Sequence, residues 1–203
     1  MDITAAHTTD AFAPEFRLAV IIGSTREGRF GPTVAGWFTD QARQHGDVEI
    51  DVIDVAGADL PDRQPAFGSE PTAALLALAE RVAAADAYVV VTPEYNHSFP
   101  AALKHFIDLH GEEWRAKAVG FVSYGGISGG LRAVEQLRPV FAELHCVTIR
   151  DGVSFHNGWA HFGEDGAAND PNGAAGAAKT MLGQLGWWAR TLRAGRSELP
   201  YTG

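Results

Sequence analysis

Cysteine, positive charge and long apolar runs are all scarce in this sequence. A single cysteine, Cys146, cannot form an internal disulfide or a thiolate cluster, which suits the reducing cytoplasm. The 16 Lys and Arg against 25 Asp and Glu give a net charge of −9, which argues against a dedicated nucleic-acid or anionic-membrane binder. No segment approaches the roughly 20 apolar residues of a membrane-spanning helix. These absences leave small ligands, phosphates included, as the expected partners.

The two ends of the chain differ in character from the part between them. Residues 1–15 are mostly small and polar and lack the basic and apolar regions of a secretory signal, so we predict a flexible N-terminal tail. Residues 196–203 predict a flexible C-terminal tail in the same way. With 46% hydrophobic and 20% charged residues, the chain has a globular composition, and we place one domain at 16–195.

Strand-like and helix-like segments alternate within this domain. Apolar or alternating runs predict strands at 18–22, 48–55, 87–92, 118–123 and 145–149. Helical spacing predicts helices at 31–45, 72–84, 99–110, 128–144 (broken or kinked at Pro139) and 174–193. The alternation predicts an α/β fold with a doubly wound parallel sheet and helices on both faces. Ligands of such sheets bind where the strands end, so the loops after the strands are the candidate sites.

Glycine is abundant, at 23 of 203 residues, and it gathers in loops that follow predicted strands. The first loop, residues 23–31 (GSTREGRFG), leads from a strand into a helix. Backbone amides at a helix start, hydroxyls of Ser24 and Thr25, and the guanidinium groups of Arg26 and Arg29 suit a phosphate. The glycine spacing fits neither a Walker A loop nor a GxGxxG fingerprint.

Two further loops carry a similar concentration of polar chemistry. The second loop, residues 92–100 (TPEYNHSFP), holds an aromatic ring, an amide, an imidazole and a hydroxyl. The third loop, residues 123–130 (SYGGISGG), has four glycines, which let a backbone lie close to a flat ligand. All three loops follow strands of one predicted sheet, so we expect them at one edge.

These loops resemble those of the NADPH-dependent FMN reductases, a flavodoxin-like group with NAD(P)H-dependent quinone, azo and chromate reductases. GSTREGRF resembles its flavin-phosphate loop, PEYNHSFPAALKHFID the segment beside the isoalloxazine ring, and SYGGISGG its third flavin loop. The resemblance spans about residues 17–193. It implies a five-stranded sheet in the order 2-1-3-4-5, FMN as cofactor and NADPH or NADH as co-substrate. It also implies ping-pong hydride transfer to a flavin, quinone or other small planar acceptor, in a homodimer or homotetramer.

The resemblance assigns site residues by their positions in these motifs. It implies that the FMN phosphate is surrounded by Ser24, Arg26, Arg29 and Phe30. It implies that the ring is lined by Pro93, Glu94, Tyr95, Asn96 and His97 on one side, and by Ser123, Tyr124, Gly125 and Gly126 on the other. Many members carry Ser where this chain has Arg29, and Asn where it has Gly31. Because the flavin carries the hydride, no catalytic side chain and no metal are expected.

Other functions fit parts of the pattern. A flavodoxin-type electron carrier would bind FMN without nicotinamide turnover, although paired arginines in the first loop favour a reductase. A serine hydrolase is the second alternative, because residues 126–130 match G-x-S-x-G around Ser128, with Asp151 and His156 in the required order. Supply of reduced flavin to a partner monooxygenase also remains open. His105 and His110 are five residues apart and miss the spacing of a zinc-binding helix.

Two long loops are expected to set the acceptor specificity. Residues 59–71 and 150–173 lack a clear period, and long loops in a compact domain are usually functional. The second segment carries aromatic side chains that could cover a planar substrate (Phe155, Trp159 and Phe162), and His156 is a further candidate there. Asp54, which follows a predicted strand without a GxGxxG motif upstream, is interpreted as a structural residue.

Overall fold

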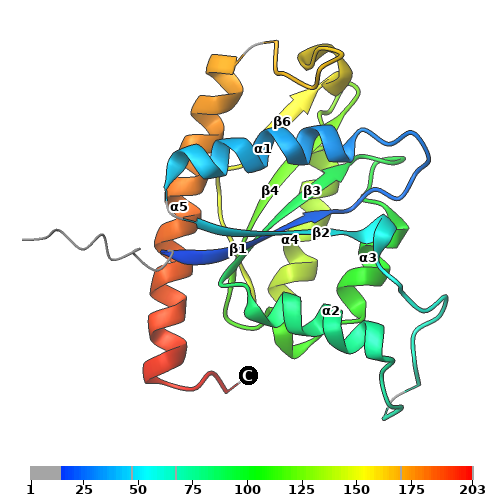
Figure 1. Ribbon diagram of the computed structural model, residues 1–203, viewed down its shortest axis with the longest axis vertical. Helices are drawn as coiled ribbons and strands as arrows, with labels where there is room; N and C mark the ends of the chain where they lie inside the picture. Colours follow the sequence, from blue (N-terminus) through cyan, green and yellow to red (C-terminus); the bar gives the residue numbers. More distant parts are fainter. Residues whose placement is uncertain (1–14, 47, 67, 170, 203) are drawn as a thin grey trace, which may run out of the picture.

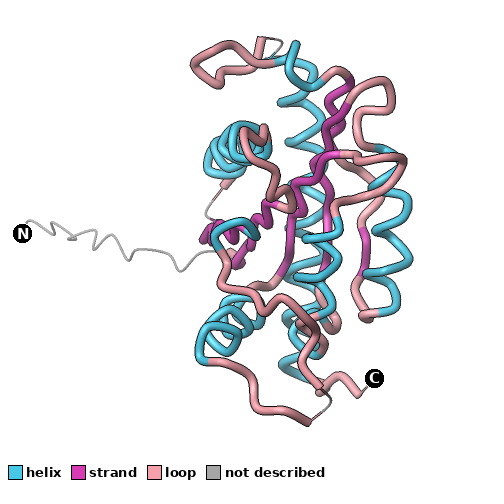
Figure 2. Tube along the Cα trace, turned by 90° about the vertical axis from the view of Figure 1, so that its right-hand side faces the viewer, coloured by secondary structure: helices cyan, strands magenta, loops and turns pink. Residues whose placement is uncertain are grey.

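The computed structural model describes residues 15–46, 48–66, 68–169 and 171–202, and it has a sheet with helices on both sides (Figure 1; Figure 2). The elements are β1 (Phe16–Ile22), α1 (Gly31–His45), β2 (Val48–Asp54), η1 (Val55–Gly57), α2 (Ala73–Ala84), β3 (Ala87–Pro93), α3 (Ala101–Asp108), η2 (Glu112–Trp114), β4 (Ala118–Gly125), α4 (Leu131–Glu143), β5 (Val147–Thr148), β6 (Val153–His156), η3 (Gly158–His161) and α5 (Pro171–Glu198). The predicted N-terminal tail lies, apart from Glu15, outside the described residues.

The strands pair in parallel in the order β2-β1-β3-β4, and β5 and β6 share the last position. β5 pairs with the beginning of β4, where Val147 lies opposite Ala118. β6 pairs with its end, where His156 lies opposite Gly125. The predicted order 2-1-3-4-5 is therefore confirmed, with the fifth strand in two pieces.

The prediction of one long loop at 150–173 is wrong in its first part, where β6 and η3 lie. Along β6, Val153 and Phe155 are buried while Ser154 and His156 are more exposed, which is the alternation of a strand. A four-residue strand surrounded by glycine and aspartate leaves too short a pattern to separate from a loop. The missed strand extends the sheet edge beside the third loop.

Two hydrophobic clusters cover the two faces of the sheet. On β1, Leu18, Val20 and Ile22 face a cluster that includes α1 and α5. Ala19 and Ile21 face the other way, into a cluster that includes α2, α3 and α4. Burial on both faces explains why the inner strands are continuously apolar.

Two helices differ from their predicted course. α4 continues past Pro139 to Glu143, because this proline lies on the exposed side, where water can bond the carbonyl that loses its partner. α5 runs to Glu198, so the expected domain end at 195 falls inside a helix. Arg196 donates to the carbonyl of Ala116 at 2.6 Å, which holds the end of α5 against the sheet. None of the described helices is long and apolar enough to cross a membrane.

Candidate functional site

The first, second and third loops follow β1, β3 and β4, which are neighbours in the sheet, and contacts join them. The hydroxyls of Ser24 and Tyr95 lie 2.8 Å apart, which connects the first loop to the second. The Glu94 amide donates to the carbonyl of Tyr124 at 3.2 Å, which connects the second loop to the third. The structure therefore brings the three loops together at one edge of the sheet.

The first loop delivers the chain into the start of α1. The helix begins at Gly31, and no side chain caps its first turn. Uncapped amides at a helix start point outward and favour an anion. Ser24 is buried beside them, and Gly28 has a φ of +64°, which allows the loop to turn back. This geometry suits a phosphate group.

Arg26 is the exposed cation of the first loop. Its guanidinium lies 4.4 Å from the centre of the Tyr95 ring, a distance at which a cation interacts favourably with the ring face. Across the described ranges, Arg26 forms no ion pair with a carboxylate. Its charge is therefore available to an incoming anion.

Arg29 has a different environment. Its guanidinium donates to both carboxylate oxygens of Asp54, at 2.6 and 2.5 Å, and to the carbonyl of Ser24 at 2.9 Å. The bidentate bond from Arg29 holds the pKa of Asp54 below its usual range and raises that of Arg29. Arg29 thus braces the first loop against the end of β2, and Asp54 is structural, as interpreted from the sequence.

The second loop turns tightly at Asn96 and His97. Tyr95 and Ser98 exchange backbone hydrogen bonds at 2.8 and 3.1 Å, and the φ angles of the two residues between them are +50° and +72°. Positive φ at both central positions is the two-residue hairpin geometry, and it leaves both side chains exposed. Gln136 of α4 holds this turn, donating to the carbonyl of His97 at 2.7 Å. No motif in the sequence singles out Gln136.

Two residues assigned to the ring lie in more enclosed positions. Pro93 is buried at the end of β3. The side chain of Glu94 is only 8% exposed, and its carboxylate accepts hydrogen bonds from the amide and the guanidinium of Arg132, each at 3.2 Å. The Glu94 carboxylate therefore stabilises the start of α4, where the amides lack partners within the helix.

The third loop is held by β4 and β6. The hydroxyls of Ser123 and Ser154 both donate to the carbonyl of Gly129, each at 2.8 Å. The amide of Asn157 donates to the carbonyl of Gly126 at 3.0 Å. Gly130 has a φ of +85°, and a Cβ there would lie 2.6 Å from that of Ser123, so only glycine fits. Gly125 and Gly126 present backbone at this point.

Tyr124 points toward the first loop. The residue is 7% exposed, and its ring packs edge-on against Phe30, with 5.8 Å between ring centres. A Cβ on Gly31 would lie 3.1 Å from the Tyr124 hydroxyl, which places that hydroxyl beneath the start of α1. Phe30 also packs against Phe162, so its ring is part of the aromatic core behind the first loop. Burial raises the pKa of Tyr124 well above its usual value.

The three aromatic residues of the 150–173 segment do not form one surface that could cover a substrate, contrary to the prediction. Phe155 and Phe162 are 2% and 7% exposed and pack into the core beside Trp37. Trp159 is 65% exposed, and Ile127 of the third loop is 86% exposed. Only Trp159 of the predicted group is free to contact a substrate. His156 interacts with the carbonyl of Ile127 through Nδ1 at 3.1 Å.

The hydrolase alternative finds no support in the geometry. Within the described part of the chain, the Ser128 hydroxyl has no hydrogen bond to a histidine, and Asp151 pairs with Gln184 and Arg150. The described residues also contain no group of three or more His, Cys, Asp or Glu side chains that could hold a metal ion.

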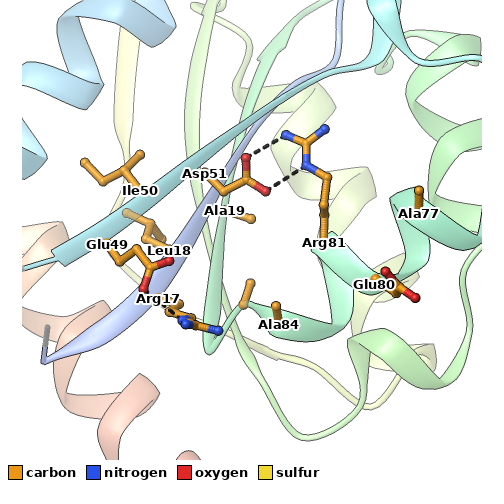
Figure 3. Close-up of a pocket in the computed structure, with 11 residues that line it drawn as sticks. Arg17, Leu18, Ala19, Glu49, Ile50, Asp51, Ala77, Glu80, Arg81 and Ala84 are labelled. Carbon is orange, nitrogen blue, oxygen red and sulfur yellow. Dashed lines mark hydrogen bonds and ion pairs between the residues drawn. The ribbon is translucent and has the colours of Figure 1, made fainter. Parts of the chain in front are cut away.

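A separate groove of about 430 Å³ lies between β1, β2 and α2 (Figure 3). Two ion pairs lie in it: Arg81 binds the carboxylate of Asp51 at 2.6 and 2.9 Å, and Arg17 binds Glu49 at 2.9 Å. Arg17, Leu18 and Ala19 belong to the beginning of β1, away from the end that carries the first loop. This groove is therefore distinct from the site formed by the three loops.

Known proteins resemble the chain over most of its length. It is 31% identical over 125 residues to an NAD(P)H-dependent FMN reductase of Schizosaccharomyces pombe, covering 56% of this chain and 60% of that protein. It is 30% identical over 131 residues to a 2-hydroxy-1,4-benzoquinone reductase of a Burkholderia species, covering 64% and 67%. The chain thus spans less than two thirds of the S. pombe relative.

The fold also matches that of a solved flavoenzyme. The structure of FerB, an NAD(P)H:(acceptor) oxidoreductase from Paracoccus denitrificans, superimposes with a TM-score of 0.70. The match covers 87% of this chain and 98% of FerB at 20% sequence identity, so it supports the fold alone. A family profile, described as NADPH-dependent FMN reductase, matches residues 16–160. On this evidence, the chain belongs to the NADPH-dependent FMN reductase family.

Proposed function

We propose that this protein is an FMN-dependent oxidoreductase that takes a hydride from NADPH or NADH and reduces a small planar acceptor such as a flavin or a quinone. The bound FMN would supply the redox chemistry, by accepting the hydride from the nicotinamide and passing it to the acceptor. Family membership and the names of the relatives support this activity.

The observation that carries the proposal is the joining of the three loops. Each contributes a different part of a flavin site: an anion-binding helix start, a tight polar turn and a strand end rich in glycine. The Ser24–Tyr95 and Glu94–Tyr124 contacts, which join the three loops, support this assignment. A flavin carrier or reductase needs all three parts at once.

The chemistry of the donor set fits FMN. We propose that its phosphate binds the uncapped amides of α1, the hydroxyl of Ser24 and the free guanidinium of Arg26. Arg29 then stabilises the loop, since both terminal nitrogens of its guanidinium already donate to the Asp54 carboxylate. Phe30 contributes packing behind the loop.

The remaining residues would orient the ring. Gly125 and Gly126 offer backbone close to a flat ligand, and their amides can donate to its polar edge. We propose that Tyr95, Asn96 and His97 border the ring on the other side, with Pro93 and Glu94 fixing the turn that presents them. Trp159 and Ile127 are exposed near the third loop and are candidates to contact the acceptor.

An acceptor panel separates the reductase from the flavodoxin-type carrier. The FMN-loaded protein is mixed with NADPH or NADH and with 1,4-benzoquinone, free FMN or an azo dye, and nicotinamide oxidation is recorded. We expect multiple turnovers with at least one acceptor. Fewer than one turnover per bound FMN with every acceptor would favour the carrier.

We further propose that the protein acts in the cytoplasm as a homodimer or homotetramer. The single cysteine supports the location, and the exposed apolar side chains of Ile127, Leu131 and Trp159 near the site support a subunit contact there. Supply of reduced flavin to a monooxygenase is compatible with this chemistry. Light scattering during gel filtration tests the assembly, and a monomer would contradict it.

A further inference from the structure

The hydroxyl of Tyr124 is a buried polar group without a partner. Among the described residues it makes no hydrogen bond, although the residue is only 7% exposed. A buried hydroxyl left unsatisfied costs roughly 1–3 kcal/mol, and such groups are rare in folded proteins. A phenylalanine would fill the same space without this cost. The hydroxyl therefore calls for an explanation beyond packing.

The position of the hydroxyl connects it to the first loop. A Cβ placed on Gly31 would lie 3.1 Å from the Tyr124 hydroxyl and 3.7 Å from the Cβ of Ser24. The two side chains therefore approach each other across the backbone of Gly31, whose lack of a side chain leaves room for both. A hydrogen-bonding interaction with Ser24 acts to lower the pKa of Tyr124, against the larger effect of burial, although the two hydroxyls do not meet the geometry of a hydrogen bond in this structure.

Ser24 has the capacity to accept a second hydrogen bond. Its hydroxyl carries one proton and two lone pairs, and in this structure it pairs with the hydroxyl of Tyr95 at 2.8 Å. If an anion bound at the start of α1 accepts the Ser24 proton, Tyr95 has to donate to one lone pair of Ser24, and the other lone pair can accept a hydrogen bond from Tyr124. A rotation of the Ser24 side chain toward Tyr124 would then satisfy the buried phenol.

We infer that Tyr124 is a positioning residue of the phosphate site, which donates to Ser24 when Ser24 donates to the phosphate of FMN. The inference rests on the proposed function, since it needs FMN as the ligand. It also reassigns Tyr124 from the ring, where the family resemblance puts it, to the phosphate. In this arrangement, the Tyr124 hydroxyl, which is costly to bury without a partner in the free protein, gains a hydrogen bond when FMN binds.

The test compares Tyr124→Phe with the wild-type protein in two respects: the affinity for each of two ligands, and the unfolding temperature without ligand. Binding is followed by the quenching of flavin fluorescence, with FMN and with riboflavin, which lacks the phosphate. We expect about tenfold weaker FMN binding, equivalent to about 1.4 kcal/mol, and unchanged riboflavin binding. Without ligand, the variant should unfold at the same or a higher temperature.

Tyr88→Phe is the matched control. Tyr88 is also buried, on the other face of the sheet, but its hydroxyl has partners: the carbonyls of Val82 and Glu113 each lie 2.8 Å away as acceptors for its proton, and Lys117 donates to it at 3.0 Å. This variant should lower the unfolding temperature and leave the ratio of FMN to riboflavin affinity unchanged. The two substitutions are chemically identical, so opposite results locate the effect at Tyr124.

A double-mutant cycle with Ser24→Ala tests the connection through Ser24. In the Ser24→Ala background, Tyr124→Phe should have no further effect on FMN affinity. Equal losses for FMN and riboflavin, additive losses in the cycle, or a lower unfolding temperature of free Tyr124→Phe would each overturn the inference. A wild-type protein that binds neither flavin would instead overturn the proposed function.

Discussion

Arg26 and Arg29 lie three residues apart in the first loop, and their environments differ. Arg29 has a carboxylate partner, while Arg26 is stacked on an aromatic ring with its charge unpaired among the described residues. A sequence motif treats both as phosphate ligands because it contains only residue type and order. The difference depends on Asp54, which follows 25 residues after Arg29 and reaches it only through the pairing of β1 with β2.

We predict that Arg26→Ala weakens FMN binding by about 10- to 100-fold, because a hydrogen bond to a charged group contributes about 1.5–3 kcal/mol. Riboflavin should bind the variant and the wild type equally, as measured by fluorescence titration. Arg43→Ala is the control, since Arg43 is exposed in the last turn of α1 and pairs with Asp40 of the same helix. An equal loss for the two flavins would place Arg26 at the ring instead of the phosphate.

His110 is a second residue whose burial has a measurable consequence. It is 2% exposed, neither ring nitrogen has a partner among the described residues, and Phe106 and Trp114 pack against it. Burial lowers the pKa of His110 below its model-peptide value of 6.5. The unfolded chain therefore binds a proton at this residue more readily than the folded protein does, so stability is lost as the pH falls below about 6.5.

We predict that His110→Phe raises the free energy of unfolding at pH 7 by roughly 1–3 kcal/mol, because it removes unsatisfied polar atoms from the core. The loss of stability between pH 8 and pH 5 should also be smaller than in the wild type. Urea unfolding at both pH values measures this, with His45→Gln at the exposed end of α1 as control. An unchanged pH dependence would show that His110 is solvated or paired.

Among the elements, the short strand β6 holds the third loop in place. Ser154 and Asn157, in and just after this strand, bond the carbonyls of Gly129 and Gly126, so β6 fixes the third loop from outside the family motif. A flexible loop would have to be ordered on binding, at a cost in affinity. Because β6 orders the third loop before the ligand binds, this cost is avoided.

We predict that Ser154→Ala weakens FMN and riboflavin binding equally, by about 2- to 10-fold, because one neutral hydrogen bond contributes about 0.5–1.5 kcal/mol. Ser123 still bonds the same carbonyl, so Ser123→Ala/Ser154→Ala should lose more than the sum of the single variants. Ser197→Ala, near the end of α5, removes an exposed hydroxyl and serves as control. Loss of FMN binding alone would contradict the role of β6 at the ring.

Most of the helices and strands could be predicted from the sequence, while the short strand β6 could not. The apolar run of β3 and the helical period of α1 each depend on local pattern, and both are confirmed nearly to the residue. β6 has only four residues and is defined by its pairing with β4. Likewise, the loops of the site could be identified from their polar residues, while the contact of Gln136 with His97 depends on packing between distant elements.

In the whole molecule, one end of the sheet carries the proposed ligand site, and the other end holds the last helix in place. The carboxyl ends of the strands carry the proposed flavin site. The other end is tied by Asp86, which accepts from the amide of Arg17 at 3.0 Å and from Arg193 and Arg196 at 3.1 and 3.2 Å. The last two bonds fix the end of α5, which continues past residue 195 to Glu198.

The proposed function requires that bound FMN exchange reducing equivalents with a nicotinamide. The most direct measurement is the visible absorption of the FMN-loaded protein after anaerobic addition of NADPH and, separately, NADH. We expect that at least one nicotinamide bleaches the flavin and that 1,4-benzoquinone, added without oxygen, restores its absorption. A flavin that stays oxidised with both nicotinamides would contradict the proposed function and favour the flavodoxin-type electron carrier.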